Sequence, residues 1–269
     1  MAKKKAGSRV PSSPFERLRR ALGLVVSRDV MVLTNAIAFN FLLCLFPLLL
    51  VLIAVSHRLS PGGGVSAAVR MLLAELIPFG GDTLAASLRQ MTRLARGLEL
   101  LSVALVVWGS SGIFMPVEMV LNHVWGGGRE RAFWKSRLLA FFLTLAGAAL
   151  VLLSVVLTIE ARGNGREWPA LAALAVKTAA LLLTWTLFVV VYRVAPSAPV
   201  SLSTAARAAF WAAALWEVSK YVFVWNLERT QIATLYGPLT FAVSLVLWAY
   251  VSSLLLVFGA AVTPAGRRG

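Results

Sequence analysis

The sequence has few of the residues on which catalytic and metal chemistry usually depends. Its 269 residues include one cysteine, Cys44, two histidines, His57 and His123, and eleven Asp and Glu residues. A single cysteine excludes a disulfide framework and a thiolate metal site within one chain. Metal-dependent phosphodiester cleavage needs carboxylates or histidines clustered around ions about 4 Å apart, whereas these acids are scattered along the chain. We therefore expect no metal site, no cofactor and no enzymatic activity.

Charged residues are also scarce, and long apolar runs take their place. Only 14% of residues are charged and 59% are hydrophobic, and the mean hydropathy is +0.81. In soluble globular proteins, apolar residues and glycine together make up roughly half of the chain. The composition therefore favours a membrane protein.

Six runs have the length of about 20 mostly apolar residues that a spanning helix needs. They are Val30–Ser56, Leu98–Met119, Leu138–Ile159, Ala170–Tyr192, Ala205–Trp225 and Leu239–Val262. The runs are continuously apolar and do not alternate, which indicates helices and not barrel strands. The predicted fold class is an all-α polytopic bundle of six transmembrane helices.

The 26 Lys and Arg residues are distributed unequally between the predicted connections. Sixteen lie in residues 1–28, 122–137, 193–207 and 263–269, which alternate spans place on one side, and eight lie on the other side. The positive-inside rule then places both chain termini in the cytoplasm. We assign the net charge of +15 to topology and to contact with anionic lipid headgroups, and expect no nucleic-acid binding. Whether the chain forms a homo-oligomer is left open.

Three regions follow from these patterns. Residues 1–29 are expected to form a basic cytoplasmic tail with an interfacial helix, residues 30–262 the six-helix membrane domain, and residues 263–269 a second cytoplasmic tail. Within the membrane domain, residues 57–97 contain two apolar stripes at helical spacing, which predict two amphipathic helices in a periplasmic cap. The first apolar run exceeds the core of a signal peptide, so we expect it to remain as an anchor.

Polar residues and helix-disrupting residues interrupt the first two runs. Asn35 and Asn40 either line a polar path or hydrogen-bond between helices. Glu118 and Asn122, four residues apart, form a second polar pair near the inner end of their run; Glu118 is a candidate for a proton or cation role or for an interfacial ion pair. Breaks in these helices are predicted at Pro47, Gly112 and Pro116.

The fifth run contains an acid and a base in an apolar segment. Glu217 and Lys220 are three residues apart and therefore share one helix face. Charges at membrane depth are costly and usually face the bundle interior or a wet cavity. We accordingly predict a buried pair, with Arg193 as a further candidate for holding an anionic group. A tight turn with a helix break is expected at Gly237 and Pro238.

Several segments together resemble the YihY/BrkB family of bacterial inner-membrane proteins. They are "AFNFLLCLFPLLL", "LNHVWGGGRERAFWKSRLLAFFLTL", "VVYRVAP" and "LWEVSKYVF…TLYGPLTFAVSLVLWAYVSSLLLVFGA". The resemblance implies six helices and a multi-pass protein of the bacterial inner membrane. It also marks a set of positions: Phe46, Pro47, Leu121, Asn122, Tyr192, Arg193, Pro196, Trp216, Glu217, Lys220, Tyr236, Gly237, Trp248, Tyr250 and Gly259.

This chain departs from the family pattern at several positions. Asn40 replaces a common aromatic residue, Cys44 replaces a common serine, and Ala261 and Thr263 stand where the family has Glu and Asn. An old ribonuclease label of the family does not fit the scattered acids and the two histidines, which the topology places on opposite sides. Two hypotheses remain: a transporter or lipid-handling export protein, and a structural or scaffolding membrane protein.

Overall fold

The structure is a computed structural model that describes residues 14–59, 99–127, 134–135, 138–139, 141–143, 170–230 and 235–263. Throughout this described part the chain forms helices and no strand, which confirms the all-α prediction. The elements are α1 (Pro14–Val25), α2 (Arg28–Leu59), α5 (Glu99–Trp125), α7 (Ala170–Val194), α8 (Leu202–Arg229), the 3₁₀ helix η1 (Gly237–Leu239) and α10 (Thr240–Val262).

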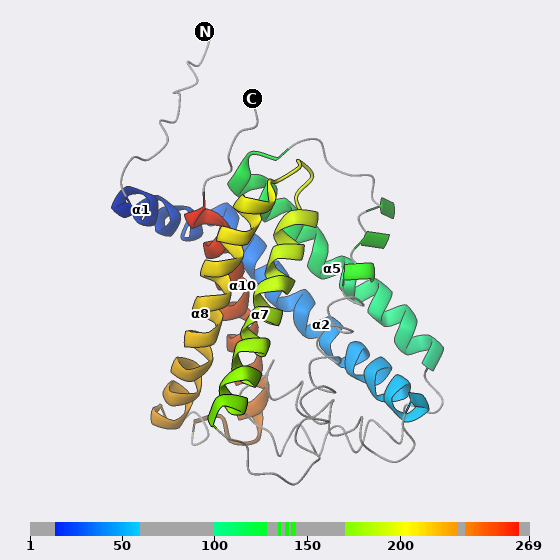
Figure 1. Cartoon of the computed structure of the whole chain (residues 1–269). Coiled ribbons are helices and arrows are strands. Elements are labelled where there is room, and N and C mark those ends of the chain that lie inside the picture. Colours follow the sequence, from blue (N-terminus) through cyan, green and yellow to red (C-terminus); the bar gives the residue numbers. More distant parts are fainter. Residues whose placement is uncertain are drawn as a thin grey trace.

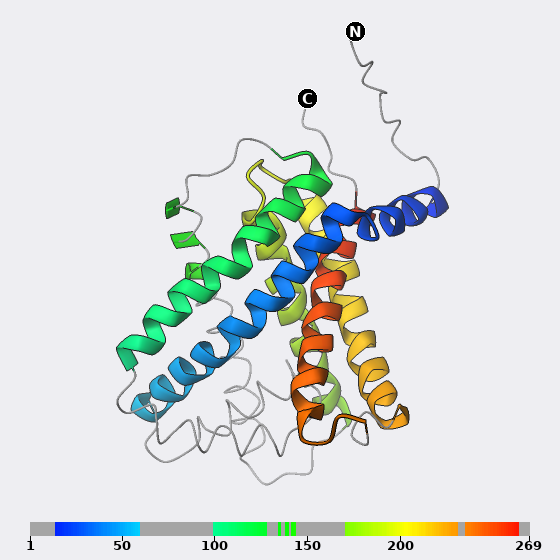
Figure 2. The same ribbon diagram turned by 180° about the vertical axis from the view of Figure 1, so that it is seen from behind.

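The long helices form two pairs joined by α10. Helix α2 packs against α5, and α7 packs against α8. Helix α10 contacts α2, α5 and α8, so it connects the two pairs, as Figures 1 and 2 show. The same helix also contacts α1. The last apolar run of the chain is therefore the central packing element of the described bundle.

The predicted spans are confirmed in part. Five of the six predicted runs correspond to long helices, whereas most of the third run, residues 138–159, and residues 60–97 of the predicted cap lie outside the described residues. Two segments of the described part, Arg28–Leu45 and Thr240–Val262, are long and apolar enough to cross a membrane, and Leu181–Val194 is a shorter apolar helix. The six-helix bundle thus stays a prediction.

The described helices bring one set of their ends to a common end of the bundle. Helices α2 and α8 begin at this end, α5, α7 and α10 finish there, and α1 lies across it (Figures 1 and 2). These are the helix ends next to the four segments that carry most of the Lys and Arg residues. The arrangement agrees with the predicted division of the connections between two sides.

The predicted helix breaks have different outcomes. Helix α2 continues through Pro47, and α5 continues through Gly112 and Pro116. These residues therefore do not end a helix, because a proline removes a single backbone hydrogen bond and the rest of the helical ladder persists. The turn before α10 is confirmed: Gly237 has a φ of +50°, which favours glycine, and Pro238 follows in the first turn of η1.

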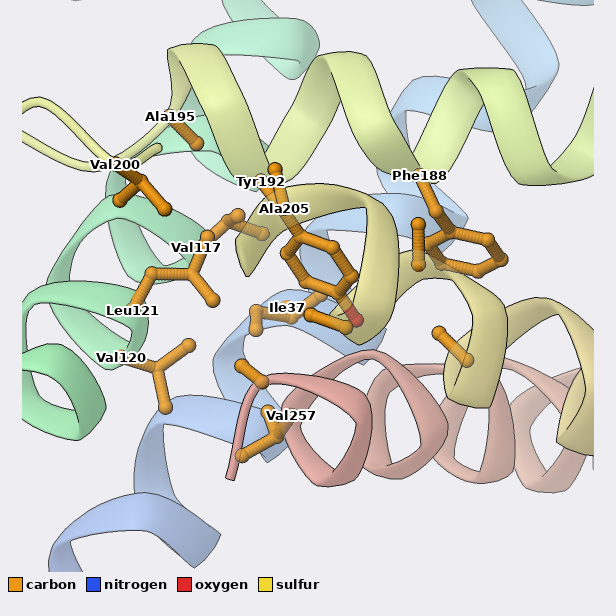
Figure 3. Packing of buried hydrophobic residues seen from close by; sticks show 14 of the residues in the cluster. Ile37, Val117, Val120, Leu121, Phe188, Tyr192, Ala195, Val200, Ala205 and Val257 are labelled. Carbon is orange, nitrogen blue, oxygen red and sulfur yellow. The ribbon is translucent and has the colours of Figure 1, made fainter. Parts of the chain in front are cut away.

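Small residues allow α8 to lie close to α7 and α10. Ala205, Ala208, Ala209, Ala212 and Ala213 are almost completely buried and recur at the three- and four-residue spacing of one helix face. In lipid, no hydrophobic effect drives helices together, so the van der Waals contacts made by closely packed small residues stabilise their association. Larger side chains fill the space beside them, as Figure 3 shows; they include Val117, Val120, Leu121, Phe188, Tyr192 and Val257.

Candidate functional site

The α8 ion pair consists of Glu217 and Lys220. The Nζ atom of Lys220 lies 2.9 Å from Oε1 of Glu217, and their side chains are 27% (Glu217) and 11% (Lys220) exposed. Helix α8 begins after Ser201, whose hydroxyl accepts a hydrogen bond from the backbone N–H of Thr204. At a rise of 1.5 Å per residue, Glu217 lies about 22 Å along the helix, close to its middle. The pair therefore forms as predicted but is only partly buried.

Aromatic residues share the helix face of the lysine of this pair. Lys220 follows Trp216 by four residues and precedes Phe223 by three, so the three share one face of α8. Trp216 and Phe223 both contact Trp248 of α10, with ring centroids 5.4 and 5.0 Å apart. Aromatic faces attract an ammonium group, more strongly when it is desolvated. This environment keeps a charged Lys220 compatible with an apolar helix face.

The carboxylate of Glu217 has room for a further partner. Its Oε1 atom is buried and, besides the ion pair with Lys220, has no hydrogen-bond partner within the described part of the chain. An ionised carboxylate offers about four acceptor positions. The arrangement can therefore accept a proton or one more donor, such as an amine or hydroxyl of a bound molecule.

A second polar group, the Glu118 cluster, comprises Glu118, Asn122 and Ser197. The hydroxyl of Ser197 donates to Oε1 of Glu118 at 2.8 Å, and Nδ2 of Asn122 donates to the Ser197 hydroxyl at 2.7 Å. The backbone N–H of Ser197 donates to Oδ1 of Asn122 at 2.9 Å. Glu118 is only 7% exposed. Three hydrogen bonds thus join the end of α5 to the connection between α7 and α8.

The local backbone supports the position of Asn122. Gly127 lies so close to Asn122 that an added Cβ atom would collide with its side chain, and the preceding Gly126 has a φ of +71°. The two glycines let the chain turn tightly at the end of α5. Since both the oxygen and the nitrogen of the Asn122 amide are bonded to Ser197, Asn122 is suited to holding the connection in place.

Aromatic donors make a second set of links at the same end of the bundle. The indole N–H of Trp125 donates to the carbonyls of Ala260 (3.1 Å) and Thr263 (2.9 Å), and the hydroxyl of Tyr192 donates to the carbonyl of Leu256 at 2.6 Å. The Trp125 and Tyr192 rings pack edge to face at 5.6 Å. These contacts tie the last turns of α10 to α5 and α7.

The remaining predicted site residues do not gather with either group. Asn35 and Arg193 are exposed. Asn40 donates to the carbonyl of Ala36 in its own helix at 2.8 Å, and its side chain lies against Gly112 of α5. For Asn35 and Asn40, a polar path and hydrogen bonding between helices both stay predictions. Asn40 marks a close approach of α2 and α5.

The two histidines lie near opposite ends of the antiparallel pair formed by α2 and α5. His57 is in the last turn of α2 and His123 is in the last turn of α5, and these helices run in opposite directions (Figure 2). In the described ranges no group of three or more His, Cys, Asp and Glu side chains is placed to hold a metal ion.

Sequence reasoning missed Ser197 as a member of the Glu118 cluster. The serine lies 79 residues from its carboxylate partner, in the segment "VAPSAPV". The two prolines that flank this serine indicate a rigid extended connection. This signal could have singled out Ser197 as a fixed polar residue, although it names no partner.

Comparisons with known proteins agree with the helical membrane architecture. The chain is 26% identical over 257 residues to a UPF0761 membrane protein of Aromatoleum aromaticum, a match that covers 92% of this chain and 63% of the relative. It is 19% identical to a UPF0761 membrane protein of Haemophilus influenzae (84% and 86% covered) and 25% identical to a ribonuclease-like protein, YfkH, of Bacillus subtilis (83% and 85% covered).

The chain spans less than two thirds of the length of the Aromatoleum relative. No solved structure matches the present chain. The family model described as virulence factor BrkB matches residues 22–268. Because this match covers nearly the whole sequence, the chain is a membrane protein that belongs to the virulence factor BrkB family.

Proposed function

We propose that this protein moves an amphipathic, lipid-like substrate across or between the leaflets of the bacterial inner membrane. The observation that carries the proposal is the α8 ion pair: an acid and a base near the middle of a 28-residue helix that contains the fifth predicted run, with Glu217 still 27% exposed. Ionisable side chains at membrane depth are costly, and those that occur commonly serve a substrate or ion pathway.

Each member of the pair has a defined role in this proposal. The Oε1 atom of Glu217 accepts a proton or a headgroup amine, because its acceptor capacity exceeds what the described residues fill. Lys220 alternates between two partners, the carboxylate of Glu217 and an anionic headgroup. Aromatic residues on the same helix face favour this alternation, because they lower the cost of partly desolvating the ammonium group. Arg193, exposed at the end of α7, attracts the same anionic group at the membrane surface.

The orientation of the protein is part of the proposal. We infer that the end of the bundle carrying α1 faces the cytoplasm, with both chain termini on that side. The distribution of Lys and Arg residues supports this orientation through the positive-inside rule. Labelling of exposed single cysteines from each side of sealed inverted vesicles tests it.

A structural or scaffolding role is the second candidate, and the aromatic packing favours it. Ring contacts of 5.0–6.0 Å link, in order, Trp125, Tyr192, Phe188, Trp216, Trp248 and Phe223. This row continues from the end of α5 into the second half of α8 and joins four helices. In a purely structural protein the α8 ion pair serves to neutralise charge and to align α8 with α10.

Reconstitution into liposomes separates the two candidates. Fluorescent phospholipids and candidate solutes are followed in wild type, in Glu217→Gln and in the double variant Glu217→Gln/Lys220→Met. Transport predicts folded variants with lost movement, because both lack the Glu217 carboxylate that exchanges a proton and the double variant also lacks the Lys220 ammonium group that holds a headgroup. A folded double variant with wild-type movement of lipid would remove the pair from any mechanism and favour the structural role.

A matched control comes from the same helix. Val218→Ala changes a side chain adjacent in sequence that is 58% exposed on the outer face of α8. We expect this variant to move substrate like wild type. Loss of movement in Val218→Ala as well would show that any change on α8 is disruptive.

We further propose that the protein is not a nuclease, although one relative carries a ribonuclease-like name. Phosphodiester chemistry requires clustered ligands or an acid–base pair within hydrogen-bond reach, and the two histidines lie at opposite ends of the antiparallel α2–α5 pair. The test is RNA incubation with purified protein. Cleavage that disappears in His123→Ala would contradict the proposal.

A further inference from the structure

Helix α1 presents an apolar stripe that the rest of the described chain does not cover. Phe15, Leu18 and Leu22 follow the spacing of one helix face, and Val26 continues it. Their side chains are 74%, 44%, 50% and 68% exposed, respectively. An amphipathic helix that turns such a stripe outward needs an apolar partner.

The adjoining face of α1 fixes its position on the bundle. Ala21 and Val25 are 0% and 9% exposed, and α1 contacts α10 and α2. Figures 1 and 2 show α1 lying across the end of the bundle, at an angle to the long helices. The helix is therefore held at the level where α2 begins and α10 finishes, which is the level of a membrane surface if these helices span the bilayer.

Basic side chains flank the exposed stripe. Arg19 and Arg20 are exposed, as is Arg28 at the start of α2, whereas Glu16 is the one acid in α1. Cationic residues next to an apolar helix face are typical of helices that lie in the headgroup region of anionic membranes. The charge of α1 thus complements an anionic surface.

We propose that α1 is a membrane-surface helix whose apolar stripe enters the headgroup–acyl boundary and whose arginines bind anionic phospholipid headgroups. A second copy of the chain is a poorer occupant of the stripe, because a symmetric contact would bring identical arginine-rich helices together. This role is independent of whether the α8 ion pair moves a substrate, so failure of one proposal leaves the other intact.

A depth measurement on the full chain tests the location of the stripe. In a Cys44→Ser background, Leu22→Cys carries an environment-sensitive fluorophore, and Gly23→Cys is the matched control. Gly23 is the next residue, and a Cβ atom there would meet nothing within 4 Å. It points about 100° away around the helix. Both proteins are reconstituted into vesicles of phosphatidylcholine with phosphatidylglycerol.

We expect the Leu22 label to be quenched strongly by spin-labelled lipid near the headgroup and the Gly23 label to be quenched by a soluble quencher. Equal quenching of both labels by the soluble quencher would overturn the proposal. So would protection of the Leu22 label from both quenchers together with cross-linking between copies, since the stripe would then be covered by protein.

A second measurement tests the arginines. Arg19→Gln/Arg20→Gln is compared with wild type for retention of phosphatidylglycerol relative to phosphatidylcholine during purification, followed by mass spectrometry. A basic residue near an anionic surface contributes about fivefold in affinity, so we expect retention to fall by more than tenfold in the double variant. Unchanged preference for phosphatidylglycerol would show that the arginines do not bind it.

Discussion

Substitution of Gly259 tests the packing that holds the end of the bundle together. A Cβ atom at Gly259 would lie 2.7 Å from the hydroxyl of Tyr192, 2.8 Å from the carbonyl of Ala208 and 2.8 Å from Cβ of Ala212. These atoms belong to α7 and α8, and two of the three cannot move without the backbone. The helices must therefore separate to admit a single methyl group.

Two opposing effects set the magnitude expected for Gly259→Ala. Overpacking of a tight core costs about 1–3 kcal/mol, and three contacts below 3.0 Å place this site at the upper end. Replacement of glycine by alanine inside a helix raises the free energy of unfolding by up to about 1 kcal/mol, because alanine has the higher helix propensity. We therefore expect a loss of about 2 kcal/mol in the free energy of unfolding, together with weakening of the Tyr192–Leu256 hydrogen bond.

The measurement is unfolding of the purified protein in mixed micelles, followed by tryptophan fluorescence. Gly23→Ala is the control, because nothing lies within 4 Å of its added Cβ atom, and it should match or slightly exceed wild type. Tyr192→Phe combined with Gly259→Ala should recover only part of the loss, since the Ala208 carbonyl still collides. A Gly259→Ala variant as stable as wild type would refute this account of the packing.

Two further variants examine the polar links at the same end. Ser197→Ala leaves Glu118 and Asn122 without the hydroxyl that joins them, so we expect a loss of about 1–3 kcal/mol in the same unfolding measurement; stability equal to wild type would mean that the cluster is not a clamp. Trp125→Phe keeps an aromatic ring, though a smaller one, and removes the donor to two carbonyls at the end of α10. Hydrogen exchange should therefore accelerate there and remain unchanged near Gly237; uniform exchange along α10 would contradict this role.

The sequence predicted much of the secondary structure but less of the candidate site. Apolar runs longer than a membrane thickness predicted the long helices, and the pair spacing predicted the contact between Glu217 and Lys220. Pro47, Gly112 and Pro116 lie within continuous helices, and their effect on helix direction depends on how neighbouring helices satisfy the backbone and pack around it. Ser197 was missed because its partners are distant in the chain.

The sequence by itself determined the class of the protein and the positions of its described long helices, because these follow from hydrophobicity and helix periodicity, which are local properties of the chain. Only the tertiary structure decided that α10 joins the two helix pairs, that α7 and α8 both pack directly against Gly259, and that Ser197 links Glu118 to Asn122. These features depend on distances between segments far apart in the chain, which no local pattern specifies.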